Sequence, residues 1–229
     1  MSKEFIYVIG DSYFQHYSNN WLDQSLTKFQ KYEVINLAKP GASFLRQWDT
    51  LENLKLDNNF LNIKYCIIGW SSAWRFYDYT NDRDWNMNKI DEYNNLTDQK
   101  KQTLKSLIKF DLWDHNIESR KGVAILNHIN SIIYKSKKYS HIKFINYFCF
   151  TDFIDANNGW YYFDNQVNFD RSLYDITYKK YGSIVQDLEN HMSVAQHKAM
   201  AKSLYHIIEY IEKTNTVPVL NSLETINEE

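Results

Sequence analysis

A serine, a histidine and two nearby carboxylates have the types and positions that acyl-transfer chemistry requires. Ser12 follows Gly10-Asp11 directly after a short apolar run, and His191 lies just before the clearest predicted helix. A serine hydroxyl is a poor nucleophile until a base accepts its proton, and the tetrahedral intermediate then needs donors directed at its oxyanion. Taken alone, Gly-Asp-Ser is more typical of a helix cap after a strand than of a nucleophile. The chemistry therefore depends on what brings Ser12 and His191 together.

The elements that would bring them together alternate along the chain. Four apolar runs predict buried strands, at 5–9, 33–38, 63–69 and 141–150. Helices are predicted at 17–30, from Ser43 through the late 50s, at 119–138 and onward from a capping box formed by Ser193 and Gln196. Strands that alternate with helices favour right-handed βαβ units. We therefore expect an α/β fold: a three-layer α/β/α sandwich with a mainly parallel, flavodoxin-like central sheet.

The chain is long enough for one large domain, expected at 1–213, followed by a weakly ordered tail at 214–229. Aromatic-rich insertions are expected near 70–115 and 150–182. In the helix at 119–138, the spacing places four isoleucines on one apolar face: Ile125, Ile129, Ile132 and Ile133.

The loops after the first three strands carry the residues of chemical interest. They are Gly10-Asp11-Ser12, Pro40-Gly41 and Gly69-Trp70-Ser71. In an open α/β sheet, ligands bind at the carboxyl ends of the strands, where such loops emerge. These loops are therefore expected to meet at one edge of the sheet.

Four segments in this order resemble the sequence blocks of the SGNH (GDSL-type) hydrolase family. They are Gly10-Asp11-Ser12, Asn36 to Ser43, Ile67 to Ser71, and Glu189 to Ser193. The resemblance covers most of the chain and implies Ser12 as nucleophile and His191 as base. It also implies an oxyanion hole that includes the backbone amides of Ser12 and Gly41.

The third block departs from the family pattern. The family's Gly-x-Asn-Asp is replaced by Gly69-Trp70-Ser71-Ser72, so a hydroxyl of Ser71 or Ser72 would have to replace the asparagine as oxyanion donor. Loss of one such donor can cost roughly 3 kcal/mol in the transition state. Gly-Trp-Ser followed shortly by Arg75 resembles a phage-associated branch of the family. The guanidinium of Arg75 could serve as a donor or bind an anionic substrate group.

The acid of the triad has two candidates. The family places an aspartate two or three residues before the histidine, and position 188 is leucine. Glu189 is preferred on spacing and Asp187 is the alternative. The carboxylate would orient the imidazole of His191 and stabilise its cation. The other interpretation is that Glu189 is an exposed residue before a helix.

Aromatic side chains gather in two stretches that follow strands. The first comprises Trp70, Trp74, Phe76, Tyr77, Tyr79, Trp85 and Tyr93, and the second comprises Phe150, Phe153, Trp160, Tyr161, Tyr162, Phe163 and Phe169. Aromatic faces interleaved with polar groups suit sugar rings. Trp70, Ser72, Trp74 and Arg75 are the predicted substrate-binding residues. Alternatively, these loops pack on each other as a lid or against another subunit. In the second case the chain would form an oligomer through its aromatic loops.

Composition excludes several classes of protein. A net charge of −2, with 26 basic and 28 acidic side chains, gives no signature of nucleic-acid or anionic-membrane binding. The apolar run near the start is too short for a signal peptide or a membrane span, so we expect a soluble protein, cytoplasmic or, if viral, virion-associated. Cys66 and Cys149 lie in apolar runs typical of buried strands, where a disulfide is not expected. No motif indicates a metal or a nucleotide cofactor.

Two functional hypotheses follow. The first is an esterase that removes acetyl or other short acyl groups from a carbohydrate through an acyl-enzyme on Ser12, without a cofactor. The second is a weakly active or non-catalytic module that binds a glycan or a protein, for example in a virion. A lipid or thioester hydrolase would differ from the first in the shape of its pocket.

Overall fold

The structure is a computed structural model, and it describes residues 3–14, 22, 29, 31–72, 75–78, 83–110, 115–149, 154–155, 159–160, 167–168 and 194–216. The strands of the main sheet are β1 (Glu4–Ile9), β2 (Tyr32–Asn36), β3 (Ile63–Trp70), β6 (Lys143–Phe148) and β9 (Val167–Asn168). Two antiparallel pairs stand outside it, β4 (Arg75–Asp78) with β5 (Arg83–Asn86), and β7 (Ile154–Asp155) with β8 (Gly159–Trp160). The α-helices are α2 (Phe44–Asn53), α3 (Asp98–Lys109), α4 (His115–Ile129) and α6 (Val194–Thr214).

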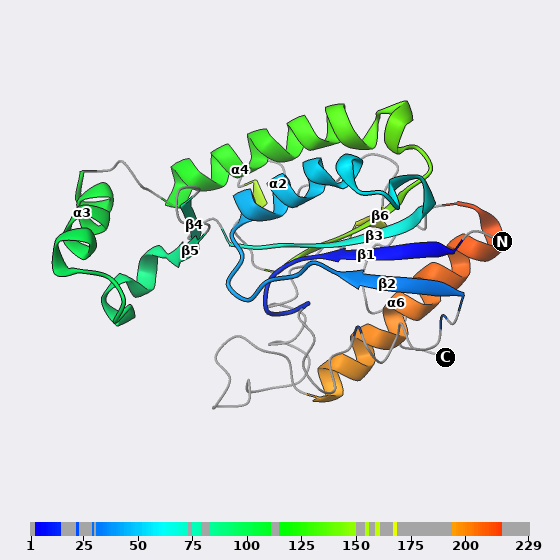
Figure 1. Cartoon of the computed structure of the whole chain (residues 1–229), viewed down its shortest axis with the longest axis horizontal. Coiled ribbons are helices and arrows are strands. Elements are labelled where there is room, and N and C mark those ends of the chain that lie inside the picture. The colour runs from blue at the N-terminus through cyan, green and yellow to red at the C-terminus, as the bar shows by residue number, and fades with distance from the viewer. Residues whose placement is uncertain are drawn as a thin grey trace.

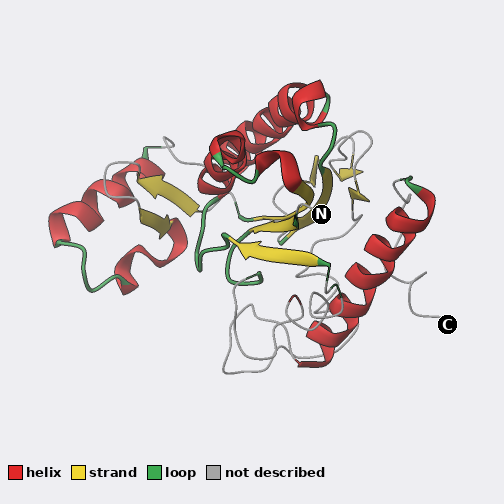
Figure 2. Cartoon of the chain, turned by 45° about the vertical axis from the view of Figure 1, so that its right-hand side comes forward, coloured by secondary structure: helices red, strands yellow, loops and turns green. Residues whose placement is uncertain are grey.

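The main sheet has the order β2-β1-β3-β6-β9, and every pairing in it is parallel. Helices α2 and α4 cover one face and α6 covers the other (Figures 1 and 2). This arrangement confirms the predicted three-layer α/β/α sandwich with a parallel, flavodoxin-like sheet. The four predicted strands are all present, with bounds that differ by two residues or fewer.

The side chains of the strands alternate between two cores, as the twofold period of a strand requires. In β1, Ile6 and Val8 face the core that contains α6, while Tyr7 and Ile9 face the core beneath α2 and α4. The same alternation occurs in the neighbouring strand β3, where Ile67 belongs to the first core and Ile68 to the second. Burial on both faces explains why these strands are continuously apolar in the sequence.

Helix α2 begins where the sequence predicts. The hydroxyl of Ser43 accepts a hydrogen bond from the Arg46 amide, with the extended backbone of an N-cap residue. Helix α6 is amphipathic as predicted, with Ala201, Leu204, Ile208 and Ile211 buried against the sheet. Of the predicted helix at 17–30, the structure describes only Leu22, which is helical, and Phe29, and both are buried in the core that contains α6. The capping Ser193 of α6 lies outside the described residues.

The predicted apolar face of the helix at 119–138 is wrong at one position. Ile129 and Ile133 are buried, but Ile132 is 56% exposed. The α-helix ends at Ile129 and continues as a π-helical turn, Asn130–Tyr134. A π turn contains more residues than an α turn. It therefore rotates Ile133 towards the sheet and Ile132 away from it.

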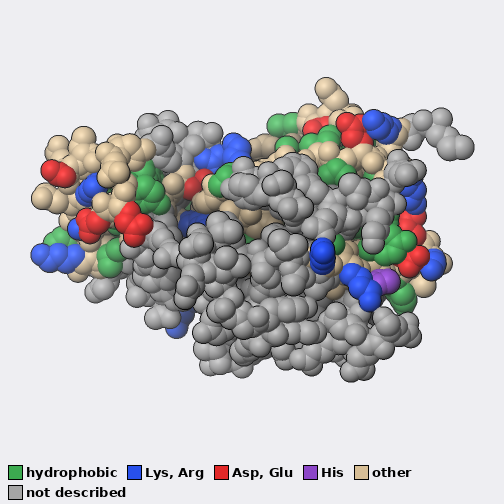
Figure 3. Space-filling view, turned by 90° about the horizontal axis from the view of Figure 1, so that it is seen from below, with side chains coloured by type: hydrophobic (Ala, Val, Ile, Leu, Met, Phe, Trp, Pro, Cys, Tyr) green, Lys and Arg blue, Asp and Glu red, His purple; other side chains and the backbone are tan. Residues whose placement is uncertain are grey.

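Short 3₁₀ helices complete the described chain, at Leu54–Leu56, Phe60–Asn62, Met87–Glu92 and Lys137–Tyr139. The β4–β5 hairpin, the 3₁₀ helix after it and α3 form a unit beyond the carboxyl ends of the main strands (Figure 1). This unit has its own small core of Trp85, Met87, Ile90, Leu96 and Leu104. On the face drawn in Figure 3, side chains of both charges are interspersed over the described surface.

Candidate active site at the carboxyl ends of the strands

Ser12 lies in a tight turn directly after β1. The Phe14 amide donates to the carbonyl of Asp11 at 3.1 Å, and the Tyr13 amide donates to the Asp11 carboxylate at 3.0 Å. Ser12 itself is half-buried, and neither its amide nor its hydroxyl bonds to a described residue. The turn therefore presents Ser12 with its polar groups uncommitted within the described part of the chain.

Glycines allow the Ser12 turn to pack closely on β3. The ring of Phe14 is fully buried, and a Cβ added at Gly69 would lie 1.9 Å from its Cε2 atom. A Cβ at Gly10 would lie 2.8 Å from the same ring. These approaches are too close for any side chain at either position. Phe14 thus fixes the turn against the centre of the sheet.

Gly41 lies in a second turn, beside the first. The Ala42 amide donates to the Lys39 carbonyl at 3.0 Å, and Gly41 has a φ of 73°. Proline followed by a glycine with positive φ is typical of a type II turn. The Gly41 amide also bonds to no described residue. The Lys39 amide donates to the Gly10 carbonyl at 3.1 Å, which joins the two turns.

Asp11 connects the segments that follow three strands of the sheet. Its carboxylate is fully buried and accepts hydrogen bonds from the Ser71 hydroxyl at 3.1 Å and from Arg75 Nη1 at 3.2 Å. The thiol of Cys149, directly after β6, lies 3.7 Å from the other carboxylate oxygen. Burial and the charge of Asp11 raise the pKa of this thiol, so it remains a donor rather than a thiolate. A buried carboxylate needs such partners.

Ser71 has a different role from the predicted one. Its hydroxyl donates to Asp11, and its amide donates to Gln47 Oε1 at 2.8 Å. The residue is fully buried. Both of its donors are therefore directed into the protein, and we remove Ser71 from the candidate oxyanion hole. Ser72 is half-buried, and its carbonyl accepts from the Arg75 amide at 3.4 Å.

Trp70 also differs from the prediction that it binds substrate. It is fully buried, its ring packs 5.3 Å from that of Phe44, and its indole N–H donates to Asn146 at 3.1 Å. Tyr134 donates to the same amide oxygen at 2.8 Å. Trp70 is therefore a core residue. Trp70 is the last residue of β3. Because side chains alternate between the two faces of a strand, that of Trp70 lies on the face covered by α2 and α4.

Two of the described aromatic residues of the insertion near 70–115 pack against each other. Trp85 is buried in the small core of its own unit, and Tyr93 packs edge-on against it at 5.0 Å. This contact lies within one insertion, so the alternative in which the two aromatic loops pack on each other stays a prediction. The described part of the 150–182 insertion comprises only the short strands β7, β8 and β9.

Several predicted site residues lie outside the described residues. They are Trp74, Asp187, Glu189 and His191. The structure thus brings Ser12, Gly41 and Arg75 to one edge of the sheet, while the encounter of Ser12 with His191 remains a prediction. Helix α6 begins three residues after His191, on the face of the sheet that contains Phe14.

Sequence reasoning missed three residues that bond to the segments at this edge of the sheet: Gln47, Asp84 and Cys149. Gln47 lies one helical turn after Ser43, the N-cap of α2. The predicted helix therefore already indicates that Gln47 lies near the Gly41 turn. Asp84 accepts a hydrogen bond from the Ser43 amide at 2.8 Å. No local signal distinguishes Asp84 from the other acidic residues of the insertion.

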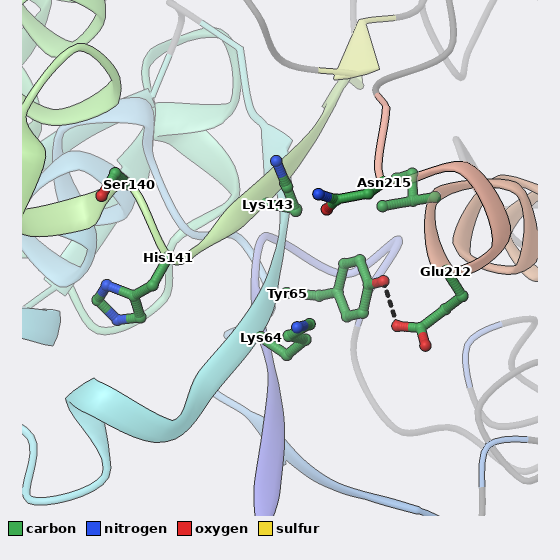
Figure 4. Close-up of a pocket in the computed structure, with 8 residues that line it drawn as sticks. Lys64, Tyr65, Ser140, His141, Lys143, Glu212 and Asn215 are labelled. Carbon is green, nitrogen blue, oxygen red and sulfur yellow. Dashed lines mark hydrogen bonds between the residues drawn. The ribbon is translucent and has the colours of Figure 1, made fainter.

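A cavity of about 460 Å³ lies at the opposite edge of the sheet (Figure 4). It is lined by residues at the starts of β3 and β6 and at the end of α6, including Lys64, Tyr65, Lys143, Glu212 and Asn215. None of the predicted site residues lines it. Within the described chain, no cluster of three or more His, Cys, Asp or Glu side chains could hold a metal ion. No described helix is both long and apolar enough to cross a bilayer.

Comparisons with known proteins give a distant structural alignment. No family model matches the chain, and no curated protein matches it. Among solved structures, the chain aligns with one titled "Crystal Structure of TesA" at 11% identity and a TM-score of 0.41, over 89% of this chain and 97% of that chain. The assignment of the fold rests on the strand order and the layers rather than on this likeness.

Proposed function

We propose that the chain is a serine esterase of the SGNH type. Ser12 would attack the ester carbonyl while His191 accepts its proton, and the alcohol would leave with that proton. Water would then hydrolyse the acyl-enzyme on Ser12, again with His191 as base. Glu189, or Asp187 as the alternative, would orient the imidazole.

One observation carries this proposal. The amides of Ser12 and Gly41 bond to no described residue, and the two turns that hold them are joined by the Lys39–Gly10 hydrogen bond. Within the described part of the chain, the adjoining turns thus offer two N–H groups without a protein partner, next to the Ser12 hydroxyl, and such donors are what an oxyanion requires.

The test compares serine and histidine variants with matched controls. A fluorophosphonate probe and short nitrophenyl esters should react with the wild-type chain and not with Ser12→Ala or His191→Ala. Ser131→Ala and His206→Ala, which remove an exposed serine and a half-exposed histidine, should retain reactivity. Undiminished labelling of Ser12→Ala would rule out the assigned nucleophile.

The proposed substrate is a carbohydrate that carries acetyl or other short acyl groups. Support comes from the aromatic and polar composition of the insertions, with Trp74 and Ser72 as candidate contacts. Turnover of acetyl esters should exceed that of long-chain esters, and acetylated polysaccharides should release acetate. A preference for long acyl chains or thioesters would contradict this substrate class.

A second candidate function is a weakly active or non-catalytic binding module, such as a virion component. The engagement of both Ser71 donors favours it, because the oxyanion would lack the side-chain donor of the third block. Binding of a glycan by a wild-type chain that the fluorophosphonate does not label would support this candidate over the esterase.

A further inference from the structure

The β4–β5 hairpin follows β3 directly and stands over the two turns of the candidate site. Its strands pair in register, with Arg75 opposite Asn86 and Tyr77 opposite Asp84. Trp85 anchors the hairpin in the small core shared with α3. The hairpin is therefore a supported element, able to hold its side chains in place.

Arg75 joins the two turns through a single nitrogen atom. Its Nη1 donates to the Asp11 carboxylate at 3.2 Å and to the Ala42 carbonyl at 3.1 Å. Asp11 precedes Ser12, and Ala42 follows Gly41. The side chain of Asp11 is fully buried and that of Arg75 is 14% exposed. Water therefore screens this ion pair only weakly.

Asp84 holds the second turn from the other strand of the hairpin. One carboxylate oxygen accepts from the Ser43 amide at 2.8 Å, and the other pairs with Arg46 Nε in the first turn of α2. The side chains of Arg46 and Asp84 are 10% and 9% exposed. The hairpin thus binds the residues on the carboxyl side of Gly41 at both Ala42 and Ser43.

We propose that the β4–β5 hairpin fixes the Ser12 and Gly41 amides relative to each other, with Arg75 and Asp84 as positioning residues. This inference rests on the proposed function, since those amides are the candidate oxyanion donors. The hairpin contributes rigidity to the two turns from outside the sheet. Neither Arg75 nor Asp84 need touch the substrate for this role.

The experiment compares Arg75→Met, Arg75→Lys and Asp84→Asn with Arg120→Met, which removes an exposed arginine on α4. Amide hydrogen exchange in the full chain reports on the turns without requiring activity. In Arg75→Met, exchange should rise in both segments, 10–14 and 39–46. In Asp84→Asn, it should rise in 39–46 alone. Arg120→Met should match the wild type.

Catalysis gives the second readout. Misplacement of the donors should lower kcat and the rate of fluorophosphonate labelling by on the order of 100-fold in Arg75→Met, with KM nearly unchanged. Arg75→Lys should recover part of the rate, because it restores the charge beside Asp11 but not the fixed guanidinium plane. A raised KM at constant kcat would instead make Arg75 a substrate contact and overturn the positioning role.

The outcomes separate this inference from the proposed function. A wild-type chain that is neither labelled nor active overturns the esterase, and the positioning role with it. If the wild type is labelled and both Arg75→Met and Asp84→Asn react at its rate, the inference alone fails. It also fails if exchange in the two segments is unchanged. Should Arg75→Met not fold, the same criteria apply to Asp84→Asn.

Discussion

Replacement of Glu212 by glutamine should destabilise the fold in a pH-dependent way. Glu212 lies near the end of α6 and receives hydrogen bonds from Tyr65 at 2.6 Å, from Tyr32 and from Lys31 (Figure 4 shows the first). It therefore connects α6 to β2 and β3. Partial burial acts to raise the pKa of Glu212, but the bonds from Lys31, Tyr32 and Tyr65 outweigh it and lower the pKa from 4.5 to about 2.

The size of the effect follows from this pKa. Each tenfold change in an acid constant corresponds to about 1.4 kcal/mol, so the fall from 4.5 to about 2 corresponds to about 3 kcal/mol. The Glu212 side chain is 27% exposed and that of Lys31 is 54% exposed. Allowing for solvent screening, we expect Glu212→Gln to lower the free energy of unfolding by about 2 kcal/mol at pH 7.

The sign of the pH dependence is fixed by the lowered pKa. The stabilisation is fully present above pH 4.5 and is lost as the pH falls towards 2, because the unfolded chain then binds a proton that the folded chain excludes. Urea unfolding of wild type and Glu212→Gln should therefore show a difference that shrinks by more than half between pH 7 and pH 3.

Glu209→Gln provides the matched control on the same helix. Glu209 is 36% exposed and pairs with Lys213 at 3.2 Å, so its replacement should change stability by less than about 0.5 kcal/mol. The reasoning is refuted if the Glu212→Gln difference is the same at pH 7 and pH 3, or if both variants are equally destabilised.

Three further outcomes are expected. Gly69→Ala should lower stability by about 1–3 kcal/mol and slow fluorophosphonate labelling, because its Cβ would displace the Phe14 ring and the turn that carries the proposed nucleophile; normal labelling would argue against that coupling. Trp70→Phe should cost about 1–3 kcal/mol through loss of the bond to Asn146 and of ring volume in the core, and leave KM unchanged, whereas a raised KM would return Trp70 to the substrate contacts. The two cysteines, free and buried, should resist iodoacetamide until the chain unfolds, as a mass spectrum of the native protein would reveal.

The sheet could be predicted from the sequence because its strands are short apolar runs with clear ends. β1 ends at Ile9, as predicted, and β3 ends within one residue of the predicted limit. The hairpin was not predicted, since Arg75 to Asn86 mixes charged and aromatic residues without a clean twofold alternation. The π turn at Asn130–Tyr134 changes the helical period within an otherwise regular apolar pattern, which explains the error at Ile132.

The site could be predicted only as far as local motifs extend. Ser12 and Gly41 follow strands directly, so their shared edge follows from the topology. The inward direction of the Ser71 donors depends on Asp11 and Gln47, which are 60 and 24 residues away along the chain. The burial of Trp70 likewise depends on Asn146, whose oxygen satisfies the indole N–H across the sheet. Contacts at such separations leave no periodic trace in a single sequence.

The carboxylate of Asp11 has a consequence for how this chain can change in evolution. Because it binds donors from β3, from the hairpin and from the end of β6, a substitution that removes one donor leaves a buried anion with fewer partners and alters the cost of the next substitution. Among relatives we therefore expect substitutions at Ser71, Arg75 and Cys149 to occur together. A substitution at any one of these three positions should be selected against unless Asp11 is also substituted.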